Sequence, residues 1–123
     1  VRRGKIDAVS LRMPWIQSPE TFFREVGPRR ESAESGRDLW SYIDARDAAA
    51  GFRAAVEARN EGHLRLFLSA ADTYSETPTL DLIHAAFGNL PLKHPITGHK
   101  AVIDTTAARD ALGFVARHSW RDY

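Results

Sequence analysis

The sequence has no cysteine, and neither sign of charge is in excess. The absence of cysteine excludes a disulfide scaffold, a thiol nucleophile and a zinc site built on thiolates. The chain has 17 Lys and Arg residues and 16 Asp and Glu residues, which gives a net charge of +1. Bulk charge therefore favours neither nucleic acid nor an anionic membrane surface as a partner.

Long apolar runs are missing as well. No stretch approaches the roughly eighteen uninterrupted apolar residues of a membrane helix, and no signal-peptide pattern opens the chain. With 123 residues, of which 43% are hydrophobic and 27% charged, the chain suits one globular domain with a core of its own. We expect a cytoplasmic protein without a membrane or nucleic-acid partner.

Strand and helix patterns alternate along the chain. Apolar patterns predict extended segments over residues 6–11, 39–43, 64–70 and 102–104, and polar residues 29–38 predict a surface loop. Capping signals predict helices that begin at Ser18-Pro19, Asp44, Thr77-Pro78 and Thr105, the last ending at Gly113. The alternation predicts an α/β fold.

Residues 44–60 carry the strongest helical pattern. Its predicted buried stripe, at three- and four-residue spacing, consists of Ala45, Ala48, Ala49, Phe52, Ala55 and Val56. Gly62 is predicted to be a left-handed cap at the end of this helix. In the strand that follows, Phe67 points away from the apolar side, which predicts that both faces of the sheet are covered.

Only about three strands are visible, whereas sheets usually have about 4–6. Strands outside this chain would complete such a sheet, and a first residue other than methionine agrees with a piece of a longer protein. An edge left open is a template for pairing, so we expect the chain to form homo-oligomers through it.

Three stretches carry motifs in a recognisable order. The first is Ala8-Val9-Ser10-Leu11-Arg12 followed by Pro14-Trp15-Ile16, and the second is W-S-Y-I-D-A-R-D-A-A at 40–49. The third combines L-F-L-S-A-A at 66–71, P-T-L-D-L at 78–82 and D-T-x-x-A-R-x-x-L-G at 104–113. Together they resemble the C-terminal portion of the NAD-dependent epimerase/dehydratase family, the extended short-chain dehydrogenases.

The resemblance implies the C-terminal part of a Rossmann-like fold. Residues 1–123 would be the small α/β substrate-binding segment, and the cofactor-binding part would lie outside the chain. The intact protein is expected to use NAD or NADP as an epimerase, dehydratase or reductase. Its substrate would be a sugar, a sugar nucleotide or a related hydroxyl or carbonyl compound. The residues that the resemblance places at the substrate are Arg12, Pro14, Trp15, Trp40, Ser41 and Tyr42.

Two motifs of that family are missing. No two glycines lie two or three residues apart, so no glycine-rich phosphate loop exists, and no tyrosine is followed four residues later by lysine. We therefore expect the segment alone to bind no nicotinamide and to be inactive, and we assign it no catalytic or cofactor-binding residue. Trp40 and Ser41 also replace the Arg-Asp pair of sugar-nucleotide members, so a smaller or less charged substrate is equally plausible, because indole cannot grip phosphate as guanidinium does.

Other interpretations compete with this one. The chain is alternatively a stand-alone, non-catalytic α/β module that binds a small molecule or a partner protein. Asp44 and Asp47 are read as helix caps rather than catalytic carboxylates, because both fall in a first turn. Three further patterns are read as structural rather than functional: a zinc site of His84, His94 and His99, a hydrolase triad on Ser10, Ser41 or Ser69, and basic pairs at 2–3 and 29–30.

Overall fold

The computed structural model describes residues 6–31 and 33–123. Four strands and four helices follow one another as β1 (Ala8–Arg12), β2 (Trp15–Gln17), α1 (Pro19–Glu25), β3 (Tyr42–Asp44), α2 (Ala45–Glu57), β4 (His63–Phe67), α3 (Thr79–Phe87) and α4 (Thr106–Leu112). Three 3-10 turns, η1 (Gly27–Arg29), η2 (Ala33–Asp38) and η3 (Trp120–Asp122), complete the described chain. The predicted α/β class is confirmed at this level.

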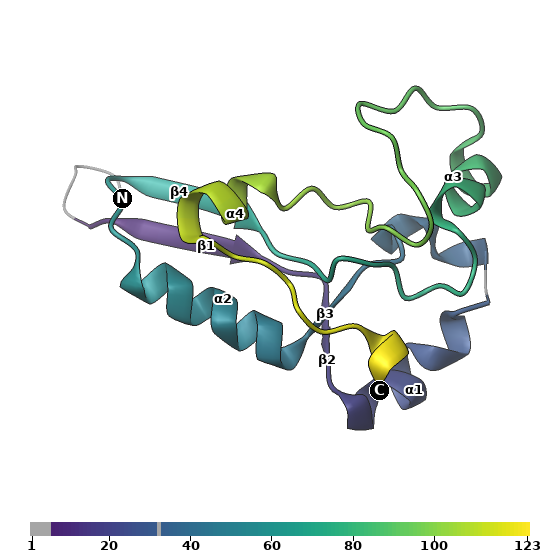
Figure 1. Ribbon diagram of the computed structural model, residues 1–123, viewed down its shortest axis with the longest axis horizontal. Coiled ribbons are helices and arrows are strands. Elements are labelled where there is room, and N and C mark those ends of the chain that lie inside the picture. Colours follow the sequence, from purple (N-terminus) through teal and green to yellow (C-terminus); the bar gives the residue numbers. More distant parts are fainter. Residues whose placement is uncertain (1–5, 32) are drawn as a thin grey trace.

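The strands form two separate two-stranded parallel sheets. β1 pairs with β4, with Val9 opposite Leu64, and β2 pairs with β3, with Trp15 opposite Tyr42. In Figure 1, α2 runs along β1 while α4 lies over β4. β1 has no strand on its other side among the described residues.

The predicted strand over residues 102–104 is wrong. The chain bends there instead, and only Lys100 makes an isolated bridge, to Asp72. The Asp104 carboxylate accepts a hydrogen bond from the Thr106 amide at 2.9 Å, which turns the chain directly into α4. Gly113 then ends α4 in the left-handed conformation, as predicted.

The segment before β3 also differs from the prediction. Within the predicted loop, Arg29 ends η1 and residues 33–38 form η2. Leu39 and Trp40 have φ angles of 54° and 52°, so they are left-handed rather than extended. The Asp38 side chain accepts a hydrogen bond from the Trp40 amide at 2.9 Å. The backbone carbonyl of Asp38 accepts from the Ser41 hydroxyl. These local bonds stabilise a conformation that non-glycine residues seldom adopt.

The buried face of α2 is narrower than the predicted stripe. Its buried residues are Asp47, Ala48 and Gly51, while Phe52 is 56% exposed and Val56 is 85% exposed. Gly51 explains the difference, because an added Cβ there would lie 2.3 Å from Leu68 Cδ1. The helix approaches the core at its glycine, and this turns Phe52 and Val56 outward.

Two further details of this region correct the prediction. Gly62 does have a positive φ of 77°, but the C-cap of α2 is Ala58, so the glycine serves the turn into β4. Phe67 is 48% exposed, with the Arg12 guanidinium 5.6 Å from its ring centre. That face of the β1–β4 sheet is therefore not covered within the described chain.

The buried apolar side chains form two clusters. One joins α1, β3 and α3 to the C-terminal residues and contains Phe22, Val26, Trp40, Tyr42, Ala70, Tyr74, Leu82, Ile83 and Trp120. The other lies between α2, β4 and α4 and contains Ile43, Ala48, Leu66, Leu68, Ala108 and Phe114. β3 contributes Tyr42 to the first cluster and Ile43 to the second, and so joins them.

Candidate functional site

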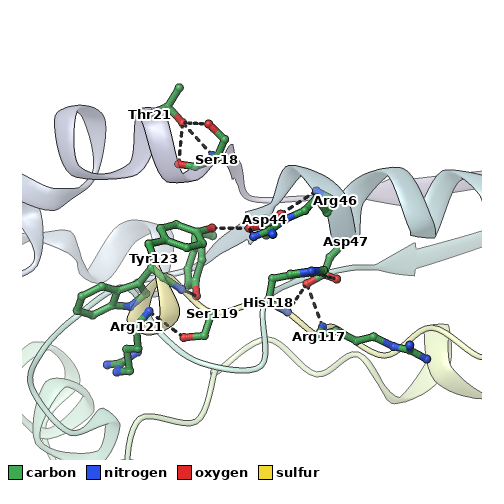
Figure 2. Close-up of polar contacts among 12 residues, drawn as sticks. Ser18, Thr21, Asp44, Arg46, Asp47, Arg117, His118, Ser119, Arg121 and Tyr123 are labelled. Carbon is green, nitrogen blue, oxygen red and sulfur yellow. Dashed lines mark hydrogen bonds and ion pairs between the residues drawn. The ribbon is translucent and has the colours of Figure 1, made fainter.

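The C-terminal segment, residues 116–123, is held by three aspartates from different parts of the chain. Asp44 caps α2, Asp47 lies in the first turn of α2, and Asp72 follows β4. Figure 2 shows Asp44 beside Tyr123 and Asp47 beside His118. In Figure 1 the C-terminus lies next to α1, where Trp120 stacks on Phe22 with ring centres 5.2 Å apart.

The buried carboxylate of Asp47 pairs with the partly exposed imidazole of His118. Asp47 Oδ1 lies 2.8 Å from His118 Nδ1, and Oδ2 accepts from the backbone amides of Arg117 and His118 at 3.0 Å each. Because the carboxylate only accepts, Nδ1 carries the hydrogen and Nε2 points away from Asp47. Within the described residues Nε2 has no hydrogen-bond partner. The predicted capping role of Asp47 is wrong, because its carboxylate oxygens accept hydrogen bonds from Arg117 and His118 of the C-terminal segment.

Asp44 is the N-cap of α2, as predicted, and it also binds Tyr123. Its side chain accepts from the Arg46 amide at 2.8 Å, from the Arg46 guanidinium at 2.7 and 2.9 Å, and from the Tyr123 hydroxyl at 2.6 Å. Burial by itself would raise the pKa of Asp44, but these hydrogen bonds outweigh it and hold the pKa below its usual range. Burial and the Asp44 charge raise the pKa of Tyr123.

Asp72 gathers a third set of donors. Oδ1 accepts from the Tyr42 hydroxyl at 2.7 Å, and Oδ2 accepts from the Ser119 hydroxyl at 2.7 Å and from the Arg121 guanidinium. The Tyr42 oxygen in turn accepts from the Trp120 amide at 2.9 Å. Burial, followed by the Asp72 charge, raises the pKa of Tyr42 above its usual value.

The six residues singled out by the resemblance fall into two groups. Arg12, Pro14 and Trp15 lie at the end of β1 and the start of β2, and Trp15 is 41% exposed beneath the Arg29 guanidinium, which lies 4.6 Å from its ring. The side chains of Trp40, Ser41 and Tyr42 are buried. Pairing of β2 with β3 places Trp15 opposite Tyr42 and so brings the two stretches together.

The remaining candidate clusters have structural partners. Among the described residues no group of three histidine or acidic side chains is placed to hold a metal ion, and His99 Nε2 donates to the Glu76 carbonyl at 2.9 Å. Ser41 and Ser69 donate to backbone carbonyls, while Ser10 lies 2.7 Å from His63 on the exposed sheet face. Arg30 pairs with Glu76, and residues 2–3 lie outside the described part.

Two hollows on the described surface lie beside these elements. A groove of about 620 Å³ runs between β1 and α2, and its lining includes Val9, Leu11, Phe52 and Val56. A smaller cavity of about 350 Å³ lies beside His118 and is lined by Ala71, Asp72, His99, Lys100, Ala116, Arg117, His118 and Ser119. Sequence reasoning missed this second hollow, because its residues come from three separated segments and form no motif.

Comparisons with protein-family models, with curated proteins and with solved structures give no match for the chain. None of the described helices is long and apolar enough to cross a bilayer. The assignment of a function therefore depends on the motifs and on the geometry described above.

Proposed function

We propose that this chain is the substrate-binding C-terminal part of an NAD(P)-dependent epimerase, dehydratase or reductase. The substrate is a sugar, a sugar nucleotide or a related hydroxyl or carbonyl compound. The rest of that enzyme supplies the nicotinamide cofactor and the acid–base group, which have no motif in this sequence. The chain by itself is catalytically inactive.

The proposal rests on the outer edge of β1 and on the apolar groove between β1 and α2. Parallel sheets occur almost only with both faces covered, and two strands are few for a stable sheet. Among the described residues no strand pairs with the second edge of β1, and the groove beside it exposes Phe52 and Val56, two large apolar side chains. An α/β domain that continues the sheet past β1 would pair that edge and cover the groove.

The position of β1 supports the proposed substrate-facing residues. Arg12, Pro14 and Trp15 sit where β1 ends, and ligands of open α/β sheets bind at the carboxyl ends of parallel strands. The indole of Trp15 offers a flat apolar wall, and the Arg29 guanidinium lies across it. Trp40, Ser41 and Tyr42 lie beneath as the buried floor that positions this loop.

The test is the intact mass and N-terminal sequence of the protein in its source, before any purification. A species about two to three times larger than 13.8 kDa is expected, by the usual domain sizes. That longer form should bind NAD or NADP in a calorimetric titration, whereas residues 1–123 should not. A native mass equal to that of this chain would overturn the proposal.

The cavity beside His118 favours a second candidate function. A stand-alone module that binds a small molecule needs a site built entirely from its own residues, and this hollow is such a site. It would be the preferred function if the native mass matched this chain alone.

A further inference from the structure

We propose that the cavity between the loop after β4 and the C-terminal segment, the His118 cavity, binds the phosphate group of a small molecule. None of the six residues that the resemblance places at the substrate lines this cavity, so phosphate binding here is a separate property of the chain. Its volume of about 350 Å³ leaves space for a small organic group beyond the phosphate.

The charge of the lining favours an anion. Lys100 and Arg117 form no ion pair within the described chain, whereas His99 is bonded to the Glu76 carbonyl and His118 to Asp47. Asp72 is the one carboxylate of the lining, and it is already occupied by Tyr42, Ser119 and Arg121. A ligand would therefore meet uncompensated cations rather than a free carboxylate.

With a neutral ring, His118 favours phosphate over a carboxylate, because only the phosphate can donate to Nε2. Asp47 accepts from its Nδ1 at 2.8 Å, which fixes the ring and leaves Nε2 unpartnered among the described residues. The side chain is 34% exposed and lines the cavity. A phosphate group near neutral pH carries both ionised oxygens and, in part, a P–OH, so it can donate to neutral Nε2 or accept from the protonated ring. A carboxylate can only accept.

Lys100 lines the same cavity as His118. Its backbone carbonyl accepts from the buried Thr79 hydroxyl at 2.7 Å, and it forms the isolated bridge to Asp72. These contacts use the main chain of Lys100, and its side chain forms no ion pair within the described chain. A substitution of the side chain should therefore remove the charge without loosening the loop.

The experiment is a titration of the full 123-residue chain with inorganic phosphate, followed by ¹H–¹⁵N NMR at fixed pH and ionic strength. We expect saturable shifts confined to the amides of residues 71–72, 99–100 and 116–119. Lys100→Gln should weaken the apparent affinity about tenfold or more, because a charge-assisted hydrogen bond is lost. His118→Asn should do the same, since its amide keeps a donor for Asp47 but has nothing in the place of Nε2.

Lys93→Gln is the matched control, because Lys93 is exposed on the loop after α3 and does not line the cavity. It should leave the affinity within about twofold. An absence of saturable shifts, or equal weakening by Lys93→Gln and Lys100→Gln, would overturn the proposal. So would acetate binding as tightly as phosphate. If His118→Asn failed to fold, the comparison of the two lysine variants would still decide the question.

Discussion

At the scale of single residues, three aspartates do three different things with the same side chain. Asp44 caps a helix and accepts from Tyr123, Asp47 accepts from two backbone amides and an imidazole, and Asp72 accepts from two hydroxyls and a guanidinium. Each binds the C-terminal segment, which therefore depends on buried acceptors more than on its own sequence pattern. Removal of one acceptor leaves donors without partners, and this lowers the free energy of unfolding.

Asp47→Ala should destabilise the protein by about 1–3 kcal/mol, because the amides of Arg117 and His118 lose their buried acceptor. Urea denaturation would measure the change in the free energy of unfolding. Hydrogen exchange should show lost protection at residues 117 and 118 while β4 keeps its own. The control is Asp110→Ala, because its pair with Arg109 is exposed and should contribute little. Equal losses in the two variants would contradict the anchoring role of Asp47.

The depressed pKa of Asp44 predicts acid sensitivity. Its ordinary pKa is 3.8 and its folded pKa is lower, so the unfolded state takes up the proton first as the pH falls. The stabilisation is complete well above pH 3.8 and is lost as the pH falls below that value toward the folded pKa. Urea midpoints measured between about pH 2.5 and 7 should fall less steeply in Asp44→Asn than in the unchanged chain. Parallel profiles would show that Asp44 is not the titrating group.

At the scale of elements, the sequence predicted correctly those features that depend on residues close together in the chain. The start of α1 at Ser18-Pro19, the cap at Asp44 and the stop at Gly113 depend on neighbouring residues and were predicted correctly. The left-handed turn at Leu39 and Trp40 depends on a hydrogen bond from the Trp40 amide to the Asp38 side chain. Residue propensities do not predict this bond.

Long-range packing explains most of the remaining differences. The outward turn of Phe52 follows from the approach of Gly51 to Leu68, a contact between elements that periodicity along one helix cannot reveal. The same holds for the candidate sites. Arg12 and Trp15 could be named from a motif, whereas the His118 cavity brings together segments 71–72, 99–100 and 116–119, and only the fold does so.

Gly51→Ala tests that contact between α2 and β4. Helix propensity alone predicts a gain of about 1 kcal/mol, but the new Cβ would lie 2.3 Å from Leu68 Cδ1 in a buried site. Overpacking of this kind costs about 1–3 kcal/mol, so we expect a net loss of up to about 2 kcal/mol. The control is Ala50→Gly on the exposed side of α2, which should lose about 1 kcal/mol from propensity. A more stable Gly51→Ala would mean that Leu68 moves aside freely.

At the scale of the whole molecule, the edge of β1 that no described strand pairs with is the surface at which another chain could add a strand. The Ala8 amide donates to the Gly62 carbonyl at 2.8 Å, and the Leu68 amide donates to the Arg12 carbonyl at 3.0 Å. Alternation along the strand therefore points the amides of Ala8, Ser10 and Arg12 toward β4. The amides of Val9 and Leu11 face the open side, where an edge strand of a second copy or of a larger enzyme would pair.

The 123-residue chain should accordingly self-associate as its concentration rises, and sedimentation equilibrium would measure this. Val9→Pro should suppress the association, because proline removes an outward donor and is tolerated on an edge strand. Ala8→Pro is the matched control: it removes the inward donor to Gly62, so it should lower the free energy of unfolding without protecting the edge. If Val9→Pro associated as strongly as the unchanged chain, the contact would lie elsewhere. The exposed groove of Phe52 and Val56 would then be the next surface to alter.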